Sequence, residues 1–129
     1  MPAEEMKSTV LVVEDNAINM KLATETLHLG GFTVLRAANG TECLSAMEKE
    51  KPHLVLLDLS LPDIDGFEVF SRVRQRAHWA DIKIIALTAL ALPEDKEKVM
   101  QAGFDAYVTK PFVPRELIKT IREMLQRDR

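Results

Sequence analysis

Five side chains in this 129-residue sequence are of types that can do chemistry together, and each follows or ends a short apolar segment. They are two adjacent acids and three separate residues: Glu14, Asp15, Asp58, Thr88 and Lys110. A carboxylate can bind a hard cation or act as a nucleophile, and a hydroxyl and an ammonium can bind charged oxygens. These are the parts needed to accept a phosphoryl group, because that transfer depends mainly on positioning and charge neutralisation.

Bringing the three acids together is unfavourable unless a cation joins them. At about 4 Å and an effective dielectric constant of about 20, each pair of like charges costs on the order of 4 kcal/mol. Oxygen ligands suit Mg²⁺, which typically takes one or two carboxylates and keeps several waters. We therefore expect Mg²⁺, or Mn²⁺, beside Glu14, Asp15 and Asp58. The alternative is that these acids cap helices or lie solvated at loop tips.

The elements that must position these residues are short β-branched segments alternating with longer segments of helical spacing. The expected strands cover residues 9–13, 33–37, 54–58, 82–88 and 106–109. The expected helices cover residues 17–29, 40–50, a segment after Gly66, 93–102 and a segment from about Pro114. The helix after Gly66 should carry Val69, Phe70, Val73 and Ala77 as one apolar stripe.

Five successive βα units predict an α/β protein with a parallel sheet, helices on both faces and right-handed crossovers. We expect a doubly wound, flavodoxin-like sheet with strand order 2-1-3-4-5. In that topology ligands bind beyond the carboxyl ends of the strands, where the first and third strands are neighbours. Glu14 and Asp15 follow the first strand and Asp58 ends the third, so the acids are expected at that place.

Composition limits the class of protein. The chain has 17 basic and 20 acidic residues, a formal charge of −3 and 47% apolar residues. We expect one domain over residues 9–129 after a flexible lead-in over residues 1–8. The acidic balance argues against direct DNA binding, and no apolar run approaches the roughly 20 residues that span a membrane. With a single cysteine, Cys43, no disulfide framework is available, and we expect a cytoplasmic protein.

In this order and spacing, the motifs resemble those of the receiver domain of two-component response regulators. The segments that carry the resemblance are residues 12–16 (VVEDN), 56–59 (LLDL) with Pro62 and Gly66, 86–89 (ALTA) and 107–112 (YVTKPF). The resemblance covers the chain from about residue 9 and favours the stand-alone chemotaxis or cell-cycle type. It implies phosphoryl transfer to Asp58 from a sensor histidine kinase or a histidine phosphotransfer protein.

The resemblance also implies a metal role for four residues. Asp15, Asp58 and the backbone carbonyl of Ser60 would bind Mg²⁺ directly. Glu14 would contact the ion through water. Asp58 would be both a metal ligand and the phosphoryl acceptor.

Further roles concern the phosphoryl group and the switch that follows. Thr88 and the backbone amide of Ala89 would hold phosphoryl oxygens, and Lys110, joined to Pro111 by a cis peptide, would pair with the phosphate. Thr88 would then move, and Tyr107 would turn inward. The face formed by the helix from Pro93, the strand 106–109 and the last helix would change shape for a downstream protein target.

The expected function is that of a signalling switch, which catalyses only its own phosphorylation and slow dephosphorylation. We expect a monomer or weak homodimer without membrane contact. A hydrophobic Leu90 near the phosphate predicts slow loss of that group. Alternatives are a receiver cut from a larger regulator or hybrid kinase, and a degenerate receiver that signals by binding alone. An aspartyl phosphatase would need a second acid where Ser60 stands, and a flavodoxin-like cofactor binder would need a phosphate-binding loop after the first strand.

Overall fold

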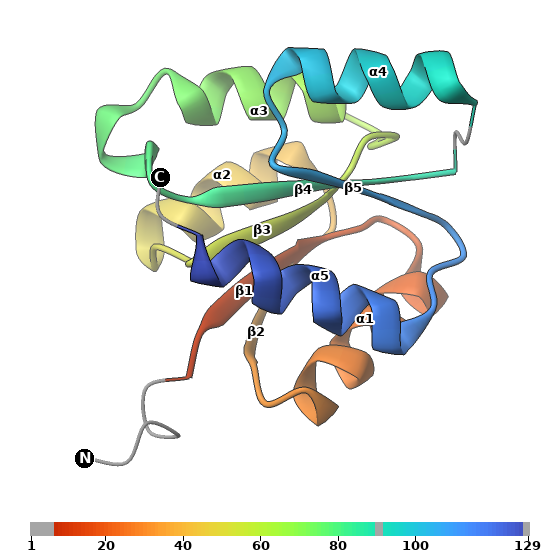
Figure 1. Ribbon diagram of the computed structural model, residues 1–129. Coiled ribbons are helices and arrows are strands. Elements are labelled where there is room, and N and C mark those ends of the chain that lie inside the picture. The colour runs from red at the N-terminus through yellow and green to blue at the C-terminus, as the bar shows by residue number, and fades with distance from the viewer. Residues whose placement is uncertain (1–6, 90–91, 128–129) are drawn as a thin grey trace.

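A five-stranded parallel sheet runs through the middle of the molecule in the computed structural model, which describes residues 7–89 and 92–127 (Figure 1). Its strands lie in the order β2-β1-β3-β4-β5, which confirms the predicted order. The strands are β1 (Thr9–Val13), β2 (Thr33–Ala37), β3 (Leu54–Asp58), β4 (Lys83–Thr88) and β5 (Ala106–Thr109). Every residue of β1, β3 and β4 is buried, as expected of strands covered on both faces.

Two helical layers cover the sheet (Figure 1). The helices are α1 (Ala17–Leu29), α2 (Gly40–Lys49), α3 (Gly66–Arg74), α4 (Pro93–Ala102) and α5 (Pro114–Gln126), with a 3₁₀ turn, η2, at Ala77–Trp79. Helices α1 and α5 pack on one face, where Leu27, Leu117 and Ile121 join the core. Helices α2, α3 and α4 pack on the other face. No helix in the described residues is long and apolar enough to cross a membrane.

Local sequence signals explain where the helices begin and end. Asn16, Asn39 and Asp65 cap α1, α2 and α3, since each side chain accepts a hydrogen bond from the backbone amide three residues later. Gly103 ends α4 with φ of 109°, a left-handed conformation that favours glycine. Hydrogen bonds and backbone conformations that involve only neighbouring residues therefore determine where these helices begin and end.

Three boundaries differ from the sequence-based expectation. Helix α2 ends at Lys49, one residue earlier than predicted. Helix α3 ends at Arg74, so Ala77 does not extend its apolar stripe but begins η2, where it is exposed. Strand β4 starts at Lys83, one residue later than predicted, although Ile82 is buried. None of these differences moves a residue of the expected site.

Candidate functional site

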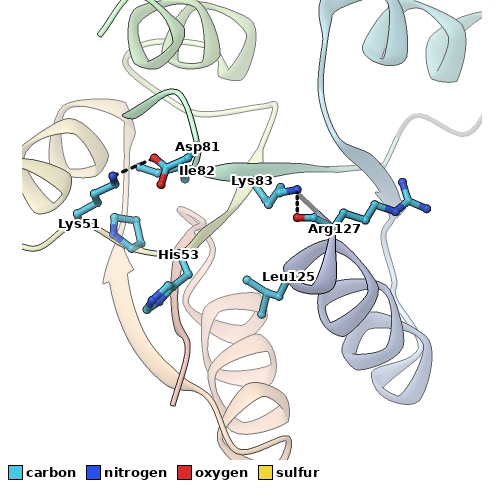
Figure 2. Close-up of a pocket in the computed structure, with 8 residues that line it drawn as sticks. Lys51, His53, Asp81, Ile82, Lys83, Leu125 and Arg127 are labelled. Atoms are coloured by element: carbon cyan, nitrogen blue, oxygen red, sulfur yellow. Dashed lines mark hydrogen bonds and ion pairs between the residues drawn. The ribbon is translucent and has the colours of Figure 1, made fainter. Parts of the chain in front are cut away.

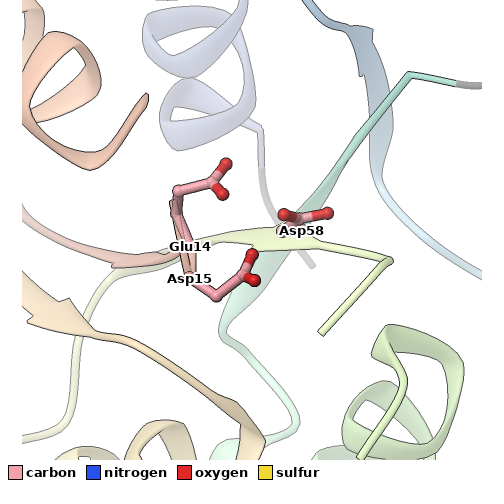
Figure 3. Close-up of side chains that lie close together, drawn as sticks. All are labelled: Glu14, Asp15 and Asp58. Atoms are coloured by element: carbon pink, nitrogen blue, oxygen red, sulfur yellow. The ribbon is translucent and has the colours of Figure 1, made fainter. Parts of the chain in front are cut away.

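Three acids converge at the carboxyl end of the sheet. Glu14 and Asp15 follow β1, and Asp58 is the last residue of the neighbouring β3. One carboxylate oxygen from each lies within 4.8 Å of the other two (Figure 3). Glu14 and Asp58 are buried, whereas Asp15 is exposed. The structure thus brings together the three acids at the place where the topology predicts a ligand.

Lys110 places an ammonium group between two of these acids. Its Nζ lies 2.9 Å from Asp58 Oδ2 and 3.1 Å from Glu14 Oε1. The residue follows β5, its backbone amide donates to the Thr88 carbonyl at 2.8 Å, and its peptide bond to Pro111 is cis, as predicted. Burial lowers the pKa of Lys110, but the hydrogen bonds to Asp58 and Glu14 and the charges of these two acids together raise it by more, so its net pKa lies above the ordinary value.

The acids nevertheless outnumber the lysine. Burial is the main cause that raises the pKa of Glu14, and the nearby Asp58 charge adds to it. The Asn16 backbone amide and Lys110 oppose that rise by donating to the Glu14 carboxylate. Within the described residues Asp15 has no ion-pair partner. Three oxygen donors and one ammonium therefore leave a negative excess that fits a hard divalent cation.

The loop that follows β3 is folded tightly against the acceptor strand. Asp58 Oδ1 accepts from the backbone amide of Ser60 at 2.9 Å, and the Gly66 amide donates to the Leu59 carbonyl at 3.0 Å. A Cβ at Gly66 would lie 2.6 Å from Leu59 Cα, so the close return of the loop requires glycine. Ser60 thus lies in a loop whose two ends are joined by the Gly66–Leu59 hydrogen bond.

Thr88 ends β4 one position beyond Leu87, the residue that pairs with Asp58. It is buried and lines a cavity of about 120 Å³ together with Ser60 and Tyr107. The Tyr107 hydroxyl is buried without a hydrogen-bond partner among the described residues. Burial, with a smaller contribution from the Asp95 charge, raises the pKa of Tyr107.

Two further residues expected at the site come after Thr88 in the sequence. Ala89 follows it and is exposed, so that its backbone is near the surface at the end of β4. Leu90 lies outside the described residues. Asp63, in the same loop as Ser60, was not expected from sequence to have a role, although its carboxylate accepts hydrogen bonds from residues of α2.

A second cavity, of about 440 Å³, lies at the opposite, amino end of the sheet (Figure 2). Its lining residues are Lys51, Pro52, His53, Asp81, Ile82, Lys83, Leu125 and Arg127. The Lys83 Nζ donates to the Arg127 carbonyl at 2.7 Å, and Lys51 pairs with Asp81 at 2.9 Å. This lining includes none of the candidate site residues, which are Glu14, Asp15, Asp58, Thr88 and Lys110.

Comparison with known proteins gives one consistent result. Residues 10–122 match the response regulator receiver domain family. The polar-differentiation response regulator DivK of Brucella anthropi is 36% identical over 120 residues, which cover 93% of this chain and 98% of DivK.

Solved structures agree with this match. The chemotaxis response regulator CheY4 of Vibrio cholerae has a TM-score of 0.86 at 30% identity, covering 92% of this chain and 98% of that one. The receiver domain of a sensor histidine kinase from Pseudomonas aeruginosa, solved with a magnesium ion coordinated in its active-site cleft, has a TM-score of 0.86 at 31% identity, covering 94% and 99%. Because the family match spans nearly all of the fold that carries the acids and the lysine, the chain belongs to the response regulator receiver domains.

Proposed function

We propose that this receiver accepts a phosphoryl group on Asp58 from the phosphohistidine of a sensor histidine kinase or a histidine phosphotransfer protein. The observation that carries the proposal is the group of three carboxylates held together with one lysine at the carboxyl end of the sheet. A transferred phosphoryl group brings further negative charge, so its acceptance there requires added positive charge.

The donor set favours Mg²⁺, or Mn²⁺, as the source of that charge. Asp15 and Asp58 would be direct ligands, joined by the backbone carbonyl of Ser60, while Glu14 would bind through water. The magnesium ion in the Pseudomonas receiver supports this proposal. When bound, the ion neutralises charge on the acids and on the phosphoryl oxygens.

The chain's own residues would position the acceptor. The Ser60 amide holds Asp58 Oδ1 and the Lys110 ammonium holds Oδ2, so the nucleophilic carboxylate has a fixed orientation. One of its oxygens forms the new bond to phosphorus, and the P–N bond to the donor imidazole breaks with its electron pair left on nitrogen. Lys110 can then pair with the phosphoryl oxygens.

The output would be a change of surface shape that a protein partner recognises. Thr88 and the Ala89 amide would bind phosphoryl oxygens, and the movement of Thr88 would alter the cavity that it shares with Tyr107. Tyr107 lies on β5, between α4 and α5 in the fold, so the α4–β5–α5 face is the proposed output surface. Such a switch requires the phosphoryl group to favour one arrangement by a few kcal/mol.

Incubation with acetyl phosphate and Mg²⁺ tests the proposal. We expect intact mass spectrometry to show one added phosphoryl group on the native chain, and none on the Asp58→Asn variant or in excess EDTA. Asp65→Asn is the matched control, because it alters an acid of the same loop and keeps a good helix cap. Equal labelling of the native chain and Asp58→Asn would contradict the proposal.

A further inference from the structure

The carboxylate of Asp63 joins the loop after β3 to the start of a different helix. Its Oδ1 accepts from the Gly40 amide at 2.8 Å, and its Oδ2 accepts from the Thr41 amide at 3.0 Å and from Thr41 Oγ1 at 2.7 Å. Oδ1 also accepts from the Ile64 amide at 2.7 Å. The hydrogen bond from the Thr41 hydroxyl is the main cause that lowers the pKa of Asp63, and the amides add to it.

The packing around this contact is also close. A Cβ at Gly40 would lie 2.9 Å from Val69 Cγ2 and 3.0 Å from Ile64 Cβ. The start of α2 therefore fits against the loop and α3 only because residue 40 is a glycine. Two independent features, the hydrogen bonds of Asp63 and the space left by Gly40, bring the loop and α2 together.

Asp63 is a second source of hydrogen bonds for the start of α2, beside the cap formed by residues next to the helix. The side chain of Asn39 already accepts from the Glu42 amide at 2.8 Å, and the Glu42 side chain accepts from the Ala38 amide at 2.8 Å. These two side chains leave the amides of Gly40 and Thr41, the first two residues of α2, and Asp63 accepts from both. Asp63 adds a second attachment, and it comes from the segment that carries Ser60.

We propose that Asp63 is a positioning residue for the metal-binding loop, residues 59–65, which it holds at the tip while the Gly66–Leu59 hydrogen bond holds the base. Ser60 lies between these two attachments. Ordering a free backbone costs about 1–2 kcal/mol per residue. A loop fixed in advance does not incur that cost when the metal ion binds. This inference rests on the proposed function, since it assumes that the Ser60 carbonyl is a metal ligand.

Mg²⁺ titration by calorimetry, together with urea unfolding, tests the inference. We expect Asp63→Ala to weaken Mg²⁺ binding about 10-fold, the range typical of residues that orient metal ligands. Phosphorylation by acetyl phosphate should return to the native rate at saturating Mg²⁺, because Asp63 does not touch the acceptor. Asp63→Asn keeps one accepting oxygen and should restore part of the affinity.

Asn39→Ala is the matched control, because it removes the other α2 cap, at a cost of about 1 kcal/mol, and leaves the loop attached. It should lower the free energy of unfolding without weakening Mg²⁺ binding. Equal affinities in the native chain and Asp63→Ala, or equal weakening in Asn39→Ala, would overturn the inference. Should Asp63→Ala not fold, Thr41→Val, which removes one of the hydrogen bonds, should weaken binding to a smaller extent, and native affinity there would count against the inference. If the native chain itself binds no Mg²⁺, the proposed function fails instead.

Discussion

The two ends of the sheet both carry buried charge, but they differ in how that charge is arranged. At the amino end, the Lys83 ammonium, in a residue only 7% exposed, bonds to the Arg127 carbonyl, and Lys51 bonds to Asp81 (Figure 2). At the carboxyl end, by contrast, carboxylates are held close to one another (Figure 3). The Lys110 ammonium lies between Glu14 and Asp58.

This difference distinguishes the proposed ligand site from the structural contacts at the amino end. The cavity at the amino end, at about 440 Å³, is larger than the one of about 120 Å³ beside Thr88. Cavity size alone would therefore favour the amino end. Like charges held close together are what require a ligand of opposite charge, because each such pair is unfavourable without one.

Replacing the lysine at the carboxyl end should have the greatest consequence. Lys110→Met leaves Glu14 and Asp58 buried without their cation, and we expect a loss of about 3 kcal/mol in the free energy of unfolding in EDTA. Excess Mg²⁺ should restore part of that loss. Urea unfolding with and without Mg²⁺ checks this, with Lys119→Met on the exposed face of α5 as the control. A native unfolding curve for Lys110→Met would show that the acids do not repel one another.

Removing the exposed acid should weaken metal binding while sparing the fold. Asp15→Asn deletes one expected ligand, so we expect Mg²⁺ affinity to fall about 30-fold, within the range for metal-site substitutions. The free energy of unfolding should change by less than about 0.5 kcal/mol, since this side chain is exposed and has no ion pair to lose within residues 7–89 and 92–127. Calorimetric titration measures the affinity. Native affinity would mean that Asp15 is not a ligand.

Replacing the buried lysine at the amino end should lower the stability of the fold without weakening Mg²⁺ binding. Lys83→Met keeps the side-chain stem but leaves the Arg127 carbonyl without this donor, so we expect about 1.5 kcal/mol less stability. Mg²⁺ affinity and labelling by acetyl phosphate should stay native. If either fell together with stability, the two ends would be coupled, and treating them as separate regions would be mistaken.

The Cys43 thiol is buried in the core on the α2 side of the sheet, and its burial gives a prediction about pH dependence. Burial raises the pKa of the Cys43 thiol to about 12. The unfolded thiol ionises near its ordinary pKa of about 8.5, so above that pH the unfolded state gains stability that the folded state does not.

We therefore expect the free energy of unfolding to fall by about 1 kcal/mol between pH 9 and pH 10, and Cys43→Ala to lack this decrease. Urea unfolding at the two pH values measures it. Rapid reaction of the folded native chain with iodoacetamide at pH 9 would show instead that water reaches Cys43.

Much of the fold was predictable from sequence because its signals are local. Asn16 and Asp65 cap helices through the amides three residues later, and Gly103 supplies a left-handed helix end. The alternation of apolar strands and amphipathic helices then leaves few topologies. Ala77 was misplaced because helical spacing continues in the sequence after α3 has ended at Arg74.

For the candidate site, the meeting of the three acids was predictable from sequence, but the contacts of their side chains were not. Strand order alone brings Glu14, Asp15 and Asp58 to one edge. The bridge from Lys110 to both Glu14 and Asp58 depends on where side chains point after the strands end. The contact of Asp63 with Gly40 spans 23 residues and depends on close packing, which no local pattern in the sequence records.

The most direct test of the difference between the two ends is a titration with Mn²⁺ followed by NMR. The paramagnetic ion broadens amide signals close to where it binds. We expect early loss of the signals of residues 14–16 and 58–60, while residues 51–53 and 83 keep theirs. Broadening that is equal at both ends, or that begins at other exposed acids, would contradict the claim that the acids at the carboxyl end form the metal site.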